Sequence, residues 1–494
     1  MDPIPLDGTV ALDRALVGGK AWAVNDLRRL GMPVPPAFTL GTDACRRTLF
    51  DGALPEAAAD ALRRGVRRLE EELGRSFGGG SRPLFVSVRS GAARSMPGMM
   101  DTVLNVGATA PALRALAAER GDGLAEDVAG RFAHQFAKVV GVAPPDDPWD
   151  QLVAAVTAVF RSWTAPRAVA YRGHHGLADD GGTAVTVQAM VFGNADERSG
   201  TGVLFTRNPL TGAAAPHGEW LPRAQGEDVV SGRVTPQPLD ALAESLPQIH
   251  ARLLDAARRL EREARDVQDI EFTVESGRLW LLQTRAAKRS PEACVRIAAA
   301  MVRERLLTTG QALSRVSADD VAAVLRPRVD PAAAATATVL ARGEPACPGV
   351  GTGTVAPSAD EAEERAEEGE DVVLATVTTD PDDVHGMVAA TAVVTELGGS
   401  TSHAAVVSRE LGRPCVVGCG AGSLTGLAGR QVTVDGGAGI VYAGPLPLVP
   451  AASPDDADLR EIAGWLGIGD LAELPAALAA PLPGVRSAHH AQPR

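Results

Sequence analysis

The fold is decided by the stretch Thr395-Glu-Leu-Gly-Gly-Ser-Thr-Ser-His-Ala-Ala-Val-Val-Ser-Arg-Glu-Leu-Gly412. Residues 392–394, which directly precede this stretch, are apolar and predict a short strand. Gly398 and Gly399 then let the backbone turn sharply. Thr401 and Ser402 are good N-cap residues. The run 404–411 favours a helix that ends at the last glycine. The stretch therefore predicts a strand, a glycine loop and a helix.

His403 falls in the first turn of this predicted helix, beside glycines that leave room for a bulky group. Unpaired backbone N–H groups and the positive end of the helix dipole favour a phosphate there. A histidine in this position could accept a phosphoryl group and hold it. Taken alone, a histidine after Thr-Ser is more simply a polar helix-start residue, so the wider sequence has to decide.

The wider string runs on through Arg413-Pro-Cys-Val-Val-Gly-Cys-Gly420. It resembles the phosphohistidine motif of the phosphoenolpyruvate-utilising enzymes, above all the pyruvate phosphate dikinases. In that family the histidine carries phosphate between two distant sites, and the resemblance implies that His403 is the nucleophile. Ser400 departs from the family pattern, which leads us to expect methionine.

Composition places bounds on the function. The 494 residues are enough for two or three domains, and the net charge of −13 argues against nucleic acid as a main partner. The five cysteines are scattered and odd in number, so they do not indicate a disulfide framework. No stretch approaches the roughly 20 apolar residues of a membrane span, and the N-terminus has no basic or apolar leader. We expect a cytoplasmic protein with no membrane contact.

Lysine is rare in this chain, with three among 48 basic residues, so each lysine is noticeable. Lys20 follows Gly18-Gly19 at the start of a predicted helix, where it could reach a phosphate. A surface lysine on an exposed turn is the alternative. The segment resembles the start of the dikinase nucleotide-binding domain, and the resemblance implies that Lys20 contacts ATP phosphates.

A second dense patch follows the predicted strand 84–88. Arg89 offers a planar donor fork at the end of that strand, and a loop of small residues with glycines suits a polyphosphate. The run 95–105, Ser-Met-Pro-Gly-Met-Met-Asp-Thr-Val-Leu-Asn, looks specifically like the dikinases. The resemblance implies that Arg89 is a phosphate ligand. Arg94 is a weaker candidate, because a loop arginine is more often solvated.

Residues 183–209 predict two strands around a polar turn. Gln188 and Met190 alternate onto one face of the first strand, and either could touch a nucleotide base. A methionine in a strand is more often part of the core. Arg207 and the run Ser199-Gly-Thr-Gly202 could line the triphosphate.

The strongest nucleotide signal is a predicted hairpin over residues 267–289. A three-residue loop, Glu275-Ser-Gly277, would pair Val274 with Arg278. Alternation along the two strands then gathers four polar side chains on one face, namely Asp269, Glu271, Gln283 and Arg285. Oxygen ligands beside an arginine suit Mg²⁺ bridging ATP phosphates.

The resemblance assigns a role to each of these four residues. It implies that Glu271 and Gln283 hold the metal, that Asp269 holds ribose or metal, and that Arg285 meets the terminal phosphate. The sequence has no Gly-x-x-x-x-Gly-Lys-Ser/Thr loop, so a P-loop enzyme is excluded.

The predicted fold class is α/β (α+β), an ATP-grasp domain followed by a swivelling β/α phosphohistidine domain. We expect an ATP-grasp domain over 1–290, a helical connector or hinge over 291–342, the mobile domain over 343–446 and a short helical extension over 447–494. The family continues after the mobile domain into a large barrel that binds phosphoenolpyruvate and pyruvate, which residues 447–494 do not resemble.

The resemblance implies a reaction in which the β-phosphoryl group of ATP goes to His403 and the γ-phosphoryl group to inorganic phosphate, with Mg²⁺ as cofactor. Onward transfer to pyruvate would give phosphoenolpyruvate, AMP and diphosphate, and we expect a separate polypeptide to carry the pyruvate site. Thr401 is a possible regulatory position, since a phosphate there would repel the triphosphate; a helix cap is the simpler explanation. A different acceptor, or a non-catalytic nucleotide-binding homologue, remains as the alternative.

Overall fold

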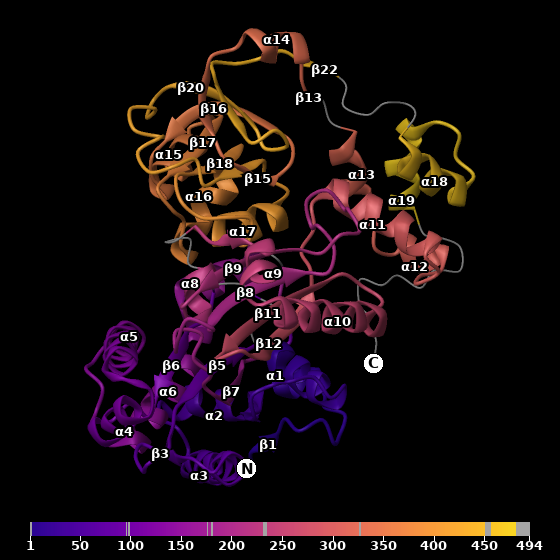
Figure 1. Ribbon diagram of the computed structural model, residues 1–494. Helices are drawn as coiled ribbons and strands as arrows, with labels where there is room; N and C mark the ends of the chain where they lie inside the picture. The colour runs from indigo at the N-terminus through magenta and orange to yellow at the C-terminus, as the bar shows by residue number, and fades with distance from the viewer. Residues whose placement is uncertain are drawn as a thin grey trace. The chain divides into compact units, whose positions relative to one another are not determined.

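The computed structural model describes residues 2–94, 96, 99–174, 176–178, 181–230, 235–325, 328–449 and 456–480. The chain divides into two compact units, coloured along the sequence in Figure 1. The first unit comprises residues 1–201, 222–226 and 270–285, and the second comprises 202–221, 227–269 and 286–494. Both mix helices with sheets, which confirms the predicted α/β class.

A five-stranded antiparallel sheet forms the centre of the first unit. Its strands lie in the order β1, β2, β7, β5, β6. Their bounds are Ile4–Pro5 (β1), Ala37–Leu40 (β2), Ala184–Ala189 (β7), Val86–Gly91 (β5) and Thr102–Val106 (β6). Arg89 pairs with Thr186, and Ser87 with Gln188, so both side chains of interest lie on the same face of the sheet.

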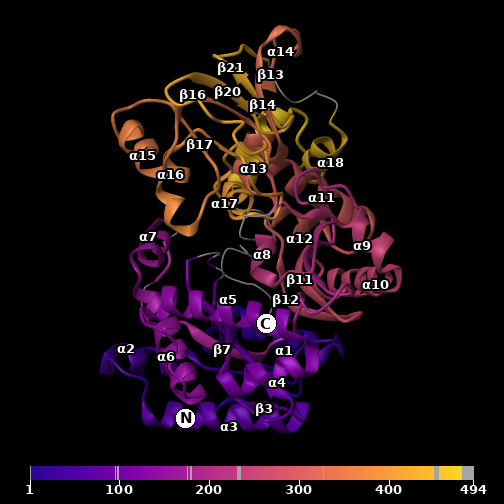
Figure 2. The ribbon, with the colours of Figure 1, turned by 60° about the vertical axis from the view of Figure 1, so that its left-hand side comes forward.

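Helices surround this sheet, and a small pair of strands, Ser76–Phe77 (β3) and Pro83–Leu84 (β4), lies at its margin. The helices of the first unit are Arg14–Arg29 (α1), Thr42–Asp51 (α2), Glu56–Leu73 (α3), Ala110–Arg120 (α4), Asp122–Val140 (α5), Pro148–Arg161 (α6) and Pro166–His174 (α7). A 3₁₀ turn at Ser162–Thr164 lies between α6 and α7. Their labels can be followed in Figure 2.

One glycine fixes where α1 meets the sheet. Gly18 has a φ of 76° and interrupts the helix, and a Cβ there would overlap the carbonyl group of Gly91 at the end of β5. The interruption is therefore tolerated only by glycine. Because Lys20 follows two residues later, this close approach places Lys20 beside β5.

A second five-stranded sheet has the order β10, β9, β8, β11, β12. The strands are Gln237–Pro238 (β10), His217–Pro222 (β9), Gly200–Phe205 (β8), Gln268–Glu275 (β11) and Arg278–Ala286 (β12). β11 and β12 form the predicted hairpin, but its loop has two residues, Ser276 and Gly277, with φ of 49° and 77°. Two positive φ angles are typical of a type I′ turn. The predicted three-residue loop is therefore wrong, and the pairing of Val274 with Arg278 loses its basis.

Three helices lie between β9 and β11 in the sequence, namely Gly226–Val230 (α8), Asp240–Ser245 (α9) and Pro247–Ala264 (α10). The connector that follows is a set of short helices. They are Pro291–Arg303 (α11), Thr309–Leu313 (α12), Ala318–Val324 (α13) and Pro331–Thr336 (α14).

The C-terminal helices Ala457–Leu466 (α18) and Leu474–Ala479 (α19) return to the connector, with a 3₁₀ turn at Leu471–Glu473 before the second. Their buried side chains Leu459, Ile462 and Leu474 share one core cluster with Ile297 and Val321. Among the described residues, no single helix is long and apolar enough to cross a membrane. α18 and residues 471–479 pass that test only as a pair bent by 69°.

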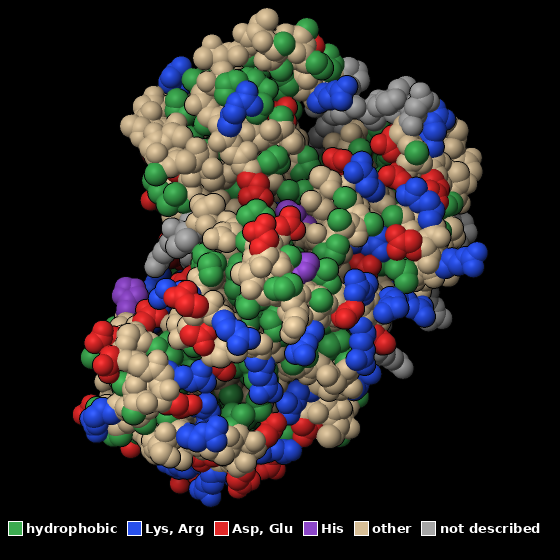
Figure 3. Space-filling view, in the orientation of Figure 1, with side chains coloured by type: hydrophobic (Ala, Val, Ile, Leu, Met, Phe, Trp, Pro, Cys, Tyr) green, Lys and Arg blue, Asp and Glu red, His purple; other side chains and the backbone are tan. Residues whose placement is uncertain are grey.

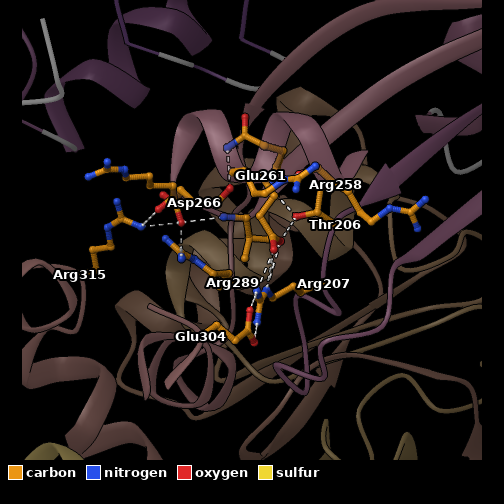
Figure 4. A network of polar contacts seen from close by, with 12 residues as sticks. Thr206, Arg207, Arg258, Glu261, Asp266, Arg289, Glu304 and Arg315 are labelled. Carbon is orange, nitrogen blue, oxygen red and sulfur yellow. Dashed lines mark hydrogen bonds and ion pairs between the residues drawn. The ribbon is translucent and has the colours of Figure 1, made fainter. Parts of the chain in front are cut away.

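Two groups of buried ion pairs fasten the connector to earlier parts of the second unit (Figure 4). Arg207, after β8, donates to Glu261 of α10 and to Glu304 at the end of α11, with closest distances of 2.8 and 2.6 Å. Asp266 binds Arg289 at 2.9 Å and Arg315 at 3.3 Å. The predicted connector is thus held by charge at Glu304 and Arg315 as well as by apolar packing.

Residues 339–444 build an eight-stranded sheet in the order β14, β21, β20, β16, β17, β18, β19, β15. The bounds are Val339–Arg342 (β14), Ile440–Ala443 (β21), Gln431–Asp435 (β20), Val350–Ala356 (β16), Val372–Thr376 (β17), Ala392–Thr395 (β18), Cys415–Val417 (β19) and Glu344–Cys347 (β15). The four strands from β16 to β19 are parallel neighbours and the remaining pairs are antiparallel.

Helices cover one face of this sheet. They are Ala359–Glu367 (α15), Val384–Ala389 (α16) and His403–Leu411 (α17), with a 3₁₀ turn at Pro381–Asp383. Leu374 of β17 belongs to the cluster under the helices, whereas its neighbour Val373 belongs to a second cluster on the opposite face. This two-sided burial explains why the strands are apolar throughout.

Two short strands join the sheet domain to the connector. Arg328–Val329 (β13) pairs antiparallel with Leu448–Val449 (β22), and the amide of Asp330 donates to the carbonyl of Pro447 at 2.9 Å. The chain therefore enters and leaves this domain through one hydrogen-bonded ribbon. On the face shown in Figure 3, basic and acidic side chains of the described residues are interspersed.

Candidate phosphate cluster and phosphohistidine loop

Arg89 is the centre of a polar cluster in the first unit. Its Nη2 lies 3.1 Å from Glu271 Oε2 and 3.3 Å from Gln283 Oε1. Its Nη1 lies 3.4 Å from Gln188 Oε1 and 3.5 Å from the carbonyl oxygen of Leu282. The guanidinium therefore joins β5, β7 and both strands of the β11–β12 hairpin. It brings together Arg89, Glu271 and Gln283, which the sequence analysis predicted as phosphate and metal ligands.

The charges of Lys20 and Arg285 also act on this cluster. Burial alone would raise the pKa of Glu271, but Arg89, Arg285 and Lys20 outweigh burial and hold that pKa below its usual value. Burial, together with the charges of Arg89 and Arg285, lowers the pKa of Lys20 to about 7, and the charge of Glu271 opposes this shift. Three cations face one carboxylate here, and such an excess of positive charge suits a polyphosphate.

Lys20 is expected to make ATP binding depend on pH. Because its lowered pKa lies near 7, the ammonium loses its proton as pH rises from 7 to 8.5, and ATP loses a cationic partner. We expect the affinity for ATP to fall by roughly tenfold over that interval. Isothermal titration calorimetry at several pH values measures this directly. The variant Lys20→Arg, which stays charged, is the control; equal pH dependence in both proteins would show that Lys20 is not the titrating group.

The oxygen atoms of Glu271 and Gln283 fit a magnesium ion. Both oxygens lie within 3.3 Å of the same Arg89 nitrogen, so a carboxylate and an amide oxygen converge on one small region, and these are the ligands that Mg²⁺ prefers. Among the described residues, no group of three or more His, Cys, Asp or Glu side chains forms a metal cluster. A magnesium ion would therefore need ligands from substrate phosphates or water as well, as Mg²⁺ commonly has in nucleotide sites.

The predicted base-contacting residues differ in their surroundings. Gln188 is buried, and its Nε2 donates to the carbonyl oxygen of Pro35 at 3.2 Å while its Oε1 faces Arg89. Met190 lies just beyond the end of β7 and lines a cavity of about 410 Å³ within the first unit. Phe85, Phe192 and Trp280 line the same cavity. Met190 thus lies on an apolar part of the wall of a cavity that arginine and glutamate side chains also line, while Gln188 contacts Arg89.

Three other residues of the sequence analysis are placed as follows. Asp269 lies on β11, two positions before Glu271, and is buried. Arg207 is bound by Glu261 and Glu304, so its guanidinium is committed to the buried ion pairs of Figure 4 rather than to a triphosphate. Arg94 is exposed. Part of the run 95–105 lies outside the described residues, namely positions 95, 97 and 98.

The His403 loop in the second unit has the predicted strand, loop and helix. α17 begins at His403, Ser402 is its N-cap, and Gly412 ends it with a φ of 63°. The His403 Nδ1 lies 3.2 Å from Thr379 Oγ1, and its Nε2 is buried without a hydrogen-bond partner. If Nδ1–H donates to Thr379, the lone pair of Nε2 is available to react. Thr379 belongs to the loop that follows β17.

The imidazole of His403 is neutral at physiological pH. Burial lowers its pKa to about 4, and the charge of Asp380 only partly opposes that effect. A neutral imidazole is the nucleophilic form, so His403 is ready to react across the whole neutral range.

The hydroxyl groups before His403 bind a carboxylate that the sequence analysis had not singled out. Ser400 Oγ donates to Glu219 Oε1 at 2.9 Å, and Thr401 Oγ1 donates to Glu219 Oε2. Glu219 lies on β9 and is 5% exposed. Thr401 is therefore not the helix cap; Ser402 caps the helix, and Thr401 is a ligand of Glu219. A Cβ at Gly399 would overlap Glu219 Oε1, which explains the second glycine of the loop.

Arg409 is a further functional candidate that no sequence pattern indicated. It is 4% exposed on α17, its guanidinium lies 6.0 Å from the centre of the Phe205 ring, and Nη1 donates to the carbonyl of Ala346 at 3.1 Å. Burial lowers its pKa, while Cys347 and Cys415, then Asp269 and Glu219, raise it. A buried cation next to acidic groups of β9 and β11 contributes to holding α17 in place.

Comparison with known proteins shows which families this chain is similar to. Residues 50–253 match the model "Pyruvate phosphate dikinase, AMP/ATP-binding domain", and residues 368–439 match "PEP-utilising enzyme, mobile domain". The chain is 40% identical to pyruvate, phosphate dikinase of Rhizobium meliloti (strain 1021) over 90% of its own length and 58% of the relative's. The corresponding values are 39%, 88% and 57% for the enzyme of Clostridium symbiosum, and 39%, 92% and 58% for pyruvate, phosphate dikinase 2 of Zea mays.

The class that fold and site define is that of the phosphoenolpyruvate-utilising enzymes, with an ATP-binding domain followed by a mobile domain that carries a histidine. Within that class the chain is similar to pyruvate, phosphate dikinases over about nine tenths of its own length. It spans less than three fifths of the length of these relatives. The proposed domain bounds 1–290, 291–342, 343–446 and 447–494 stay predictions.

Proposed function

We propose that this chain is a pyruvate phosphate dikinase-like phosphotransferase that moves the β-phosphoryl group of ATP to His403 Nε2 and the γ-phosphoryl group to inorganic phosphate. The observation that supports it best is the neutral, buried His403, whose Nε2 has no hydrogen-bond partner. The cluster around Arg89 supplies the cations that an ATP polyphosphate needs. The relatives' name supports pyruvate as the final acceptor.

The residues of this chain would divide the work as follows. Lys20, Arg89 and Arg285 balance the phosphate charge, and Glu271 with Gln283 would hold Mg²⁺, which would supply further positive charge at the phosphate oxygens. Thr379 would accept the Nδ1–H of His403, which leaves the lone pair of Nε2 available as the nucleophile. Asp269 is proposed for ribose or metal.

The base of ATP is proposed to lie in the cavity beside Met190. Phe85 lies opposite Met190 and Arg89 lies opposite Thr186. Because side chains alternate along a strand, Phe85 and Arg89, four positions apart, lie on the same side of the sheet. Four residues along a strand correspond to about 13 Å. A nucleotide can bridge that separation, with its base against Met190 and its phosphates at Arg89.

Onward transfer to pyruvate needs a pyruvate site, which we propose to lie outside the two matched domains. The present chain aligns with only part of each relative. A histidine that carries phosphate on a domain of its own can serve such an acceptor, because the phosphoramidate keeps the group activated until the acceptor is reached.

Labelled ATP tests the proposal. Incubation with Mg²⁺, inorganic phosphate and ATP labelled separately at the β and γ positions should put acid-labile label on the protein from the β position only. The variant His403→Ala should incorporate none while still binding ATP. Label from the γ position would replace the dikinase mechanism with a direct kinase transfer, and absence of label with intact ATP binding would support a regulatory nucleotide-binding protein.

A further inference from the structure

Ser400 stands where the resemblance to the family leads us to expect methionine, and it is completely buried. The hydroxyl group of Ser400 makes two polar contacts. It lies 3.1 Å from His217 Nε2 and 2.9 Å from Glu219 Oε1. Both partners belong to β9, so one serine hydroxyl connects the loop before His403 to two side chains of the same strand.

The proton positions in this contact can be worked out. A serine hydroxyl has one proton and two lone pairs, and this proton is donated to Glu219. The contact with His217 can then be a hydrogen bond only if Nε2 carries a proton and donates it to Ser400 Oγ. The result is a directed chain from His217 to Ser400 to Glu219. Methionine could not continue it, because a thioether has no proton to donate.

The buried carboxyl groups make this chain energetically significant. Each oxygen of Glu219 has one hydroxyl donor, from Ser400 or Thr401, and a buried carboxylate that loses a donor is penalised for its desolvation. Glu344 lies beside the same serine: burial and the charge of Glu219 raise the pKa of Glu344, and hydrogen bonding to Ser400 lowers it. Removal of the hydroxyl would leave Glu219 with one donor fewer and with a second carboxyl group, that of Glu344, nearby.

We infer that Ser400 is a positioning residue, which with His217 and Glu219 holds the His403 loop against β9 and so sets how often His403 is presented for phosphorylation. The inference rests on the proposed function for its effect on rate, but not for the docking itself. The contact is made by hydroxyl, imidazole and carboxylate groups where the family pattern leads us to expect an apolar methionine.

The test measures docking and reaction separately. Hydrogen–deuterium exchange of the peptide covering residues 396–404 reports how firmly the loop is held, and single-turnover labelling of His403 from ATP reports the reaction. The variants are Ser400→Ala and His217→Leu, which break the chain, and Ser400→Thr and His217→Gln, which keep a hydroxyl or an N–H donor. Ser245→Ala is the matched control, because Ser245 is an exposed serine that bonds only to the carbonyl of Ala241.

We expect Ser400→Ala and His217→Leu to speed loop exchange and to slow labelling, each by about tenfold, while the dissociation constant for ATP stays unchanged. The donor-keeping variants and Ser245→Ala should behave as wild type. If Ser400→Ala exchanges and reacts as wild type does, the inference is overturned. Faster loop exchange with an unchanged rate of His403 labelling would support the contact between the loop and β9, but would overturn the inference that Ser400 positions His403 for the reaction.

Two outcomes separate this inference from the proposed function. If wild type takes up no label but the exchange differences are as expected, the proposed function fails and the docking contact stands. If Ser400→Ala proves misfolded, which loss of ATP binding would reveal, the pair His217→Leu and His217→Gln decides the question from the β9 side. Equal exchange in those two variants would also overturn the inference.

Discussion

The variant Arg89→Met is expected to bind ATP about 100-fold more weakly than the wild type. Arg89 is the residue on which Glu271, Gln283 and Gln188 converge, and its side chain is only 14% exposed. Its loss removes a charge-assisted phosphate ligand, worth about 1.5–3 kcal/mol, and leaves Glu271 to repel the incoming phosphates. A factor of ten corresponds to about 1.4 kcal/mol, so these effects reach two orders of magnitude.

Calorimetric titration with ATP and Mg²⁺ measures this loss. Arg47→Met is the matched control, since Arg47 is an exposed arginine of α2 in the same unit. Arg89→Lys should rescue only part of the affinity, because an ammonium group cannot reproduce the planar fork that contacts several acceptors. An Arg89→Met protein that binds ATP as tightly as Arg47→Met would remove Arg89 from the site.

Arg207→Met is expected to lower the free energy of unfolding by about 3–5 kcal/mol, the usual cost of removing one partner from a buried ion pair. Arg207 is buried and pairs with two carboxylates, of which Glu261 keeps 13% and Glu304 keeps 43% of its side chain exposed. Without the arginine, Glu261 must remain charged with poor solvation or take up a proton. Burial lowers the pKa of Arg207, but Glu304 and Glu261 raise it above its usual value, which shows that the ion pairs dominate.

Urea unfolding followed by circular dichroism gives this number. Arg303→Met is the control: Arg303 pairs with Asp458 at 2.6 Å but is half exposed, and surface pairs contribute about 0–1 kcal/mol. Equal stability losses for the two variants would mean that burial of the Arg207 ion pairs has no special role in joining the connector to β8 and α10.

The strand, loop and helix around His403 could be predicted because every signal in that stretch is local. The N-cap serine, the terminal glycine and the apolar strand act within a few residues of one another. The polar residues of the β11–β12 hairpin were also recognisable by type. Its loop was not, because Ser276 adopts a positive φ that is unusual for serine, and the three-residue and two-residue loops contain the same amino acids.

The contacts of Glu219 and Arg409 could not be predicted from sequence. The contacts of Glu219 depend on the meeting of β9 with a loop about 180 positions later, and those of Arg409 depend on the meeting of α17 with Phe205 and Ala346. Neither residue lies in a pattern that marks such an encounter. For Arg207 the sequence suggested a role that its contacts do not support. An arginine after a glycine-rich run suggested a phosphate ligand, yet two glutamates from distant helices bind it. Partners far apart in sequence decided all three cases.

The ribbon formed by β13 and β22 limits how the sheet domain can travel. A domain on one flexible linker explores a sphere, and its local concentration at any one target falls as the linker lengthens. Here both ends of residues 339–444 are gathered in a single hydrogen-bonded pair, so any movement of the domain would have to carry that ribbon with it. Such a movement would confine His403 to an arc, and encounters with a target on that arc would become more frequent without any gain in intrinsic affinity.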